Sequence, residues 1–242
     1  MIKNFILKSR KLNRLLRSIE YIRALLFGVA AAIEHEPILR MRSYAMVVDI
    51  GANRGQFALA VRHYFPGSRI ISFEPLPTPS STFRRIFRND KGIILYQVAI
   101  APYEGEEEIH ISKRDDSSSL LPITSTQSDL FPGTEESGKA KIYAAPLTKY
   151  IKLDEIVSPA LLKLDVQGYE LEALRGCKEL LPRFDSIYVE CSFVELYQGQ
   201  ALAHEVIAYL SDSGFLLSGV YNIVYDQDGK AIQGDFLFKS EI

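Results

Sequence analysis

The stretch from Met46 to Phe57, which reads MVVDIGANRGQF, constrains the fold of this chain more than any other. Its first residues are apolar on both sides of Asp49, as in a buried parallel strand, and an apolar-periodic helix follows the glycines Gly51 and Gly55. Glycine lets the backbone turn tightly and lets a ligand approach the main chain, while the amides at the helix start favour an anionic group. The sequence therefore predicts an α/β domain with a small-molecule cofactor at this turn.

The spacing of the turn argues against a dinucleotide. A dinucleotide fingerprint needs glycine where this chain has Asn53 and Gln56, so a dehydrogenase is disfavoured. The next predicted strand, Arg69–Phe73, ends in Glu74, and an acid about 20 residues past the glycine turn can accept hydrogen bonds from both hydroxyls of a ribose.

Taken together, these residues resemble the cofactor motifs of S-adenosylmethionine-dependent methyltransferases with a Rossmann-like fold. The residues expected to hold the cofactor are Asp49, Gly51, Asn53, Gly55 and Glu74.

Length and composition fit one such domain. The chain has 242 residues, 47% of them hydrophobic, and we expect a catalytic domain over residues 46–242 with an N-terminal extension over residues 1–45. Cys177 and Cys191 show no metal-like or framework spacing, which is typical of a reducing, cytoplasmic compartment. The four histidines are scattered, so a histidine-built metal site is not expected.

The extension is basic, with nine Lys or Arg residues against three Glu, whereas the rest of the chain carries a net charge of −8. Its apolar residues recur every three or four positions, as in an amphipathic helix; they are Phe5, Ile6, Leu12, Leu15, Leu16, Ile19, Ile22, Leu25 and Leu26. Such a helix can pack on the domain, pair with a second copy, or attach peripherally to an anionic membrane. The apolar run Ala24–Ile33 is shorter than the ~20 residues that span a bilayer.

A second strand–turn–helix unit makes the resemblance specific. The segment from Leu162 to Gly176, LKLDVQGYELEALRG, is similar to the signature of the FkbM family of methyltransferases, L-K-x-D-V-E-G-x-E-x-x-V-L-x-G, with Gln167 in place of the family's Glu. The match runs from about Val47 to about Phe238 and leaves out only the N-terminal arm.

The resemblance implies a Rossmann-like class I methyltransferase fold, α/β, with a seven-stranded mostly parallel sheet, an antiparallel edge hairpin and helices on both faces. We expect the hairpin strands at Phe215–Tyr221 and Asp235–Lys239, and a continuous third strand at Ile93–Ile100. The resemblance also places Ala99 beside the adenine. The implied reaction is O-methylation of a hydroxyl on a carbohydrate or secondary metabolite.

Three residues are expected to serve catalysis. Asp165 ends a predicted central strand, where it can face the methyl group or cap the following helix. Lys163 shares its strand face, and a lysine in an apolar strand needs a carboxylate partner or an opening to the cleft. Glu190 ends the predicted strand Ser186–Glu190, and with Asp165 it could hold a magnesium ion that acidifies the acceptor.

A long polar segment, residues 112–138, separates the two arms of a predicted hairpin, Glu106–Ser112 and Lys139–Ala145. It is either a loop that covers the substrate or a mobile insertion. In a substrate-covering loop, Ser117–Ser119 could contact the ligand. The catalytic domain lacks clusters of basic and aromatic residues, so nucleic acid is not expected as the substrate. The competing hypothesis is a cofactor-binding or membrane-associated accessory protein without catalysis.

Overall fold

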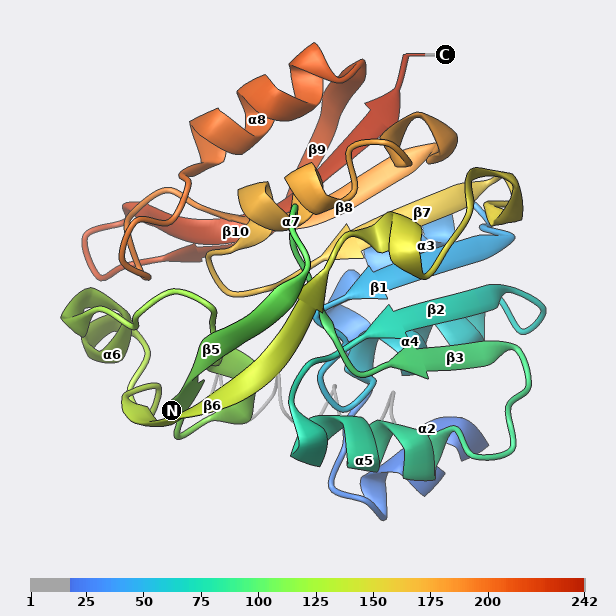
Figure 1. Ribbon diagram of the computed structural model, residues 1–242, viewed down its shortest axis with the longest axis horizontal. Helices are drawn as coiled ribbons and strands as arrows, with labels where there is room; N and C mark the ends of the chain where they lie inside the picture. The colour runs from blue at the N-terminus through green and yellow to red at the C-terminus, as the bar shows by residue number, and fades with distance from the viewer. Residues whose placement is uncertain (1–17, 242) are drawn as a thin grey trace.

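The computed structural model describes residues 18–241, and their central feature is one seven-stranded sheet (Figure 1). The strands lie in the order β3-β2-β1-β7-β8-β10-β9. They are β1 (Met46–Ile50), β2 (Arg69–Phe73), β3 (Ile93–Tyr96), β7 (Ala160–Leu164), β8 (Ser186–Ser192), β9 (Phe215–Tyr225) and β10 (Ala231–Ser240). The pairings from β3 through β8 are parallel, and β10 is antiparallel to both of its neighbours. The predicted sheet with its antiparallel edge hairpin is confirmed.

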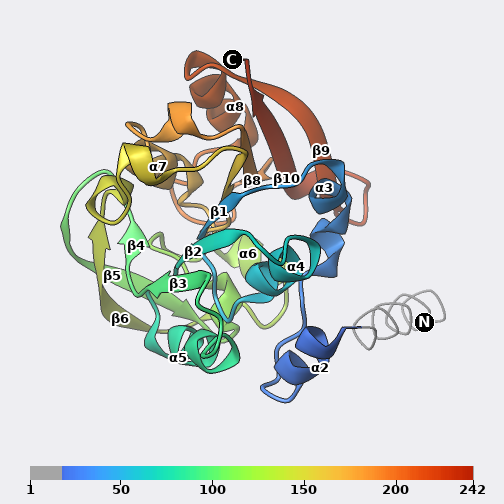
Figure 2. The same ribbon diagram turned by 90° about the vertical axis from the view of Figure 1, so that its right-hand side faces the viewer.

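Helices cover both faces of this sheet. The α-helices are α2 (Ile19–Leu25), α3 (Glu36–Met41), α4 (Gln56–Tyr64), α5 (Pro77–Ile86), α6 (Ser125–Leu130), α7 (Glu170–Gly176) and α8 (Ala203–Asp212). Short 3-10 turns are η1 (Ile33–His35), η2 (Asp115–Ser117), η3 (Leu147–Lys149), η4 (Leu153–Glu155) and η5 (Leu181–Arg183). Figure 2 shows α3 and α4 on one side of the sheet and α7 on the other. Side chains alternate accordingly: Val47 packs in the core under α3 and α4, and Val48 packs in the core under α7 and α8.

A second, smaller sheet lies beside the first, in the order β4-β6-β5. It contains β4 (Ala99–Ile100), β5 (Gly105–Ser112) and β6 (Glu136–Ala145), and the antiparallel pair β5–β6 confirms the predicted hairpin. The prediction of one continuous strand over Ile93–Ile100 is wrong. The neighbouring strand β2 ends at Phe73, which lies opposite Tyr96, so the chain leaves the large sheet after Tyr96. Ala99 pairs with Ala144 of β6 instead.

The turns after β1 and β7 lie against each other because Gly51 has no side chain. Its φ is +81°, and a Cβ at this position would lie 1.8 Å from the carbonyl oxygen of Asp165. Gly168, with φ +94°, is similarly close to the ring of Tyr197, at 2.9 Å. The two motifs found in the sequence are therefore brought together at the carboxyl end of the sheet.

The described part of the N-terminal segment packs on the domain. Tyr21 and Ala24 of α2 are buried with Leu59 of α4, and α3 adds Ile38 and Leu39 to the core beneath the sheet. The residues of the predicted amphipathic helix before Ser18 lie outside the described residues. Within residues 18–241, no helix is long and apolar enough to cross a membrane.

Candidate functional site

A cavity of about 380 Å³ lies at the carboxyl ends of β1, β2 and β7. Its walls include six residues predicted for the site: Gly51, Asn53, Glu74, Ala99, Lys163 and Asp165. The volume is within the range of small-molecule sites, about 300–1,000 Å³. The position is the one where open α/β sheets bind their ligands.

The remaining two predicted cofactor residues lie behind the cavity wall. Gly55 has φ +93°, and a Cβ there would lie 2.6 Å from the ring of Phe87 and 2.9 Å from that of Phe83. Asp49 is completely buried in β1. The structure therefore assigns both residues a place under the turn, and a direct contact of either with a cofactor stays a prediction.

Glu74 is held at the cavity edge by backbone amides. Its Oε2 accepts a hydrogen bond from Asn53 N at 2.9 Å, and its Oε1 accepts one from Leu76 N at 2.8 Å. Each carboxylate oxygen has a second lone pair, which remains available to a ligand hydroxyl. Burial raises the pKa of Glu74 to about 7, although the two amides act in the opposite direction.

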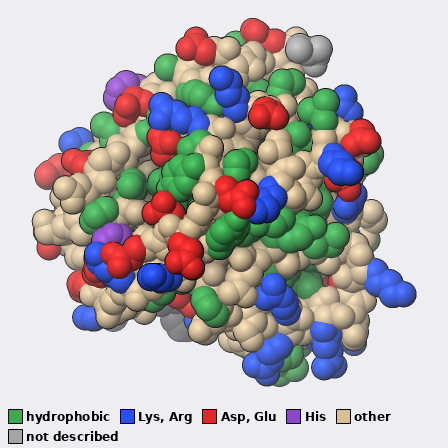
Figure 3. Space-filling model, viewed as in Figure 1, with side chains coloured by type: hydrophobic (Ala, Val, Ile, Leu, Met, Phe, Trp, Pro, Cys, Tyr) green, Lys and Arg blue, Asp and Glu red, His purple; other side chains and the backbone are tan. Residues whose placement is uncertain are grey.

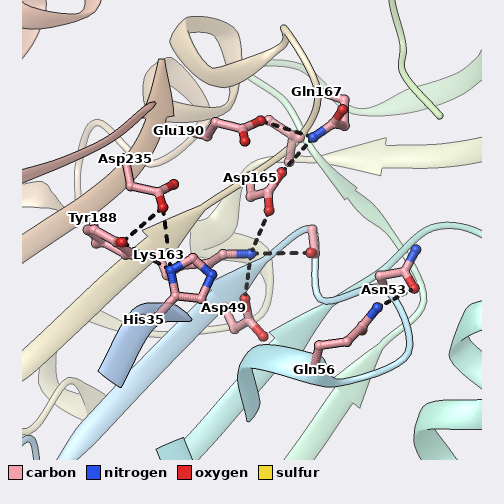
Figure 4. Close-up of polar contacts among 12 residues, drawn as sticks. His35, Asp49, Asn53, Gln56, Lys163, Asp165, Gln167, Tyr188, Glu190 and Asp235 are labelled. Atoms are coloured by element: carbon pink, nitrogen blue, oxygen red, sulfur yellow. Dashed lines mark hydrogen bonds and ion pairs between the residues drawn. The ribbon is translucent and has the colours of Figure 1, made fainter. Parts of the chain in front are cut away.

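Lys163 connects the two motifs from below the cavity. Its Nζ lies 3.3 Å from Oδ1 of Asp49 and 3.5 Å from Oδ2 of Asp165, and it donates to the carbonyl oxygen of Gly51 at 3.4 Å (Figure 4). Lys163 was expected either to pair with a carboxylate or to reach the cleft, and in the structure it pairs with carboxylates and also lines the cavity. Burial disfavours its charge, but the two carboxylates more than offset this and raise the pKa of Lys163. Burial also raises the pKa of Asp49.

Gln167 bridges two carboxylates. Its Nε2 donates to Oδ1 of Asp165 at 2.8 Å and to Oε2 of Glu190 at 3.0 Å, as Figure 4 shows. Its Oε1 accepts a hydrogen bond from the hydroxyl of Tyr197 at 2.8 Å. Hydrogen bonds at both Nε2 and Oε1 therefore fix the Gln167 side chain. The backbone of Gln167 lies in the left-handed region, with φ 56°. Asp165 is held by these contacts and does not cap α7, whose N-cap is Tyr169.

Glu190 lies inside β8, which continues to Ser192, so the prediction that it ends the strand is wrong. It is absent from the cavity lining and reaches Asp165 only through Gln167. Burial and the neighbouring acids, Asp165 first among them, raise the pKa of Glu190 well above its usual range. Among residues 18–241, no group of three or more His, Cys, Asp or Glu side chains is arranged to hold a metal ion.

A histidine that the sequence did not single out also lines the cavity. His35, from η1, has its Nδ1 3.0 Å from the hydroxyl of Tyr188 and 3.4 Å from Oδ2 of Asp235. Burial lowers the pKa of His35. Asn222 completes the group by donating to the same Asp235 oxygen at 2.7 Å. His35, Tyr188 and Asp235 are far apart in the sequence, so no local sequence pattern predicts that they meet.

The segment between β5 and β6 forms the opposite wall. Residues 114–120 line the cavity, and Asp115 forms an ion pair at 2.5 Å with Arg54 of the glycine turn. Ser119 donates to the carbonyl oxygen of Gln167 at 2.6 Å. Within the described chain this segment therefore forms part of the cavity wall, which includes Ser117–Ser119, and a contact of these serines with a ligand stays a prediction.

The cavity is acidic. Its lining contains five Asp or Glu residues against two Lys or Arg residues, namely Glu34, Glu74, Asp115, Asp116 and Asp165 against Arg114 and Lys163. A lining of this sign favours a cationic ligand and disfavours a pyrophosphate.

Comparison with known proteins gives one family. The model of the methyltransferase FkbM domain matches residues 49–217. The chain is 27% identical over 161 residues to the 2-O-methyltransferase NoeI of Sinorhizobium fredii, with 64% of this chain and 66% of NoeI covered. It is 24% identical over 159 residues to methyltransferase 1 of Beauveria bassiana, with 60% and 64% covered. The chain thus spans just under two thirds of the length of these relatives.

A solved structure shares the fold. A putative O-methyltransferase from Klebsiella pneumoniae superimposes with a TM-score of 0.52 at 12% identity, covering 100% of this chain and 96% of that one. The match to the FkbM methyltransferase domain and the two methyltransferase relatives favour an enzyme over the accessory protein without catalysis.

Proposed function

The chain belongs to the FkbM family of methyltransferases, and we propose that it transfers the methyl group of S-adenosylmethionine to a hydroxyl of a carbohydrate or secondary metabolite. The acidic cavity at the glycine turn is the observation that carries this proposal. S-adenosylmethionine has a net positive charge, which an acidic lining favours, whereas NAD brings an anionic pyrophosphate, which such a lining disfavours. The name of one relative, a 2-O-methyltransferase, supports a hydroxyl acceptor.

The residues present fit this cofactor. The carboxylate of Glu74 would accept hydrogen bonds from the ribose hydroxyls, and the backbone at Gly51 and Asn53 would lie along the ligand. Ala99 offers a small apolar surface at the cavity wall for the base. When bound, S-adenosylmethionine supplies an electrophilic methyl group on a sulfonium.

We assign to Asp165 the removal of the proton from the acceptor hydroxyl. Its carboxylate lines the cavity and is 35% exposed, so it can accept the hydroxyl proton while the acceptor oxygen attacks. Gln167 and Lys163 fix this carboxylate from two directions, which keeps the base in one orientation. Glu190 acts through Gln167 as a positioning residue.

The proposal is tested by incubating the protein with S-adenosylmethionine labelled in its methyl group and a panel of hydroxylated glycans and metabolites. Label should appear in an acceptor as an alkali-stable ether. Asp165→Asn should lower kcat about 100-fold, within the usual range for a general base, and change the affinity for S-adenosylhomocysteine by less than about threefold.

Asp212→Asn is the matched control, because Asp212 is exposed on α8 and outside the cavity lining. It should retain full activity. Unchanged turnover of the Asp165→Asn variant would show that Asp165 is not the general base.

A further inference from the structure

A second hollow, of about 810 Å³, lies between α2 and the end of α5, and it shares no lining residue with the proposed reaction site. Arg23, Leu26 and Phe27 line it from the α2 side, and Arg85, Arg88 and Lys91 are among the residues on the other side. Figure 3 shows Lys and Arg side chains gathered at the lower right of the molecule, where Figure 1 places α5 and α2. We call these lining residues, with Ile19 and Ile22, the α2–α5 surface.

The acids of this surface are already engaged. Asp90 accepts from Arg62 Nε at 2.7 Å, and Glu20 accepts from the Ser18 hydroxyl at 2.6 Å. Within residues 18–241, by contrast, Arg23, Arg88 and Lys91 are exposed and form no hydrogen bond or ion pair through their side chains. Three cations on one surface are therefore available to an anionic partner.

An apolar ridge lies beside these cations. Tyr21 and Ala24 turn the inner side of α2 toward the domain, and the opposite side presents Ile19, Ile22 and Leu26 at three- and four-residue spacing. Ile19 is 65% exposed and Leu26 is 81% exposed. Large apolar side chains exposed next to unpaired cations are typical of helices that lie in a membrane interface.

The sequence before α2 has the same character. Residues 1–17 contain six Lys or Arg residues and no Asp or Glu, together with several large apolar residues. The sequence that immediately precedes α2 is thus basic as well.

We propose that the α2–α5 surface docks the enzyme on an anionic lipid bilayer. Arg23, Arg88 and Lys91 contact lipid phosphates, and the ridge of Ile19, Ile22 and Leu26 enters the headgroup region. The charge complementarity commits the surface to anionic lipid, because Asp90 is paired with Arg62 and the basic residues of the surface outnumber Glu20, its other acid.

The test is sedimentation of the full chain with vesicles of phosphatidylcholine, with and without phosphatidylglycerol, at two salt concentrations. The protein should bind the phosphatidylglycerol vesicles, and less at high salt. Each cation near such a surface contributes about fivefold to partitioning, so Arg88→Glu/Lys91→Glu should weaken binding about 25-fold or more. Ile19→Ser/Leu26→Ser should weaken it at both salt concentrations.

Lys152→Glu/Lys178→Glu is the matched control, because both lysines are exposed elsewhere and the change in net charge is the same. This control should bind vesicles as the wild type does. Affinity for S-adenosylhomocysteine should be unchanged in all of these variants, which keeps failure here distinct from failure of the proposed function.

Three results would overturn the docking proposal. They are equal binding to both kinds of vesicle, equal loss in the Arg88/Lys91 variant and its control, and no vesicle binding by the wild type. In the third case, light scattering that shows a dimer broken by Arg88→Glu/Lys91→Glu would assign the surface to self-association.

Discussion

At the end of β2, the carboxyl group of Glu74 connects cofactor binding to pH. Burial raises its pKa to about 7, and only the ionised form can accept a hydrogen bond from each ribose hydroxyl without a proton between them. At lower pH the Glu74 carboxyl group is protonated, and it must lose this proton before the ligand binds. Affinity for S-adenosylhomocysteine should therefore rise as pH increases through about 7 and level off above it.

Titration calorimetry from about pH 6 to about pH 8 measures this dependence, which should approach tenfold per pH unit on the acidic side. Glu74→Gln should bind weakly and lose the pH dependence, because the amide does not titrate in this interval. A wild-type affinity that is flat across the interval would contradict the role given to Glu74.

Gln167 is the residue where this chain differs from the signature of its family. Its neutral amide donates to Asp165 and Glu190, so a carboxylate at this position would place three acids in contact. The carboxylate introduced by Gln167→Glu would repel its two neighbours, and this repulsion would favour protonated carboxyl groups at the site. We expect turnover to fall about tenfold at neutral pH and the optimum of the pH–rate profile to move to higher pH.

Gln167→Ala separates position from charge, since it removes the bridge without adding an acid. It should lower kcat and leave the pH optimum in place. If Gln167→Glu kept the wild-type profile, the bridge would have no part in holding Asp165.

At the scale of elements, β1 and β7 are joined by a buried ion pair. Asp49 is fully buried and Lys163 nearly so, and their atoms lie 3.3 Å apart. Removing only the lysine leaves an uncompensated buried acid, so Lys163→Met should lower the free energy of unfolding by about 3 kcal/mol or more. Urea denaturation near neutral pH measures this change.

The double variant Asp49→Asn/Lys163→Met is the control, because it removes both charges. It should recover much of the lost stability. Equal stability of the single variant and the wild type would show that the pair contributes nothing to joining the two strands.

Elements with an unambiguous period were predictable. The strand, turn and helix at β1 and α4 lie where they were predicted, and β2 has the predicted bounds, since an apolar strand run followed by glycine and a helical apolar period allows one interpretation. The run Ile93–Ile100 was predicted as one strand because its β-branched residues suit a strand throughout. The strand in fact ends where its neighbour β2 ends.

The site was predictable only in part, for the same reason. Residues at strand ends, such as Glu74 and Asp165, follow from the position of the turns, and both line the cavity. His35 and the bridge through Gln167 depend on contacts between distant segments, which no local pattern encodes.

At the scale of the whole molecule, four separate segments contribute to the walls of one acidic cavity. The glycine turn and the β7 turn form its floor, residues 114–120 form a wall, and His35 from the N-terminal segment completes it. Arg54 and Asp115 connect the turn to the wall. The identity of the acceptor does not follow from the fold, so the acceptor screen must establish it.

The most direct test of the account is calorimetric titration of the purified protein with S-adenosylmethionine, S-adenosylhomocysteine and NAD, with and without magnesium. We predict that both sulfur ligands bind at one site, that Glu74→Ala weakens both about tenfold or more, and that NAD does not bind. Binding that is independent of magnesium fits the Gln167 bridge between the two carboxylates. Folded protein that binds neither sulfur ligand, or that binds NAD instead, would contradict the assignment of the cavity.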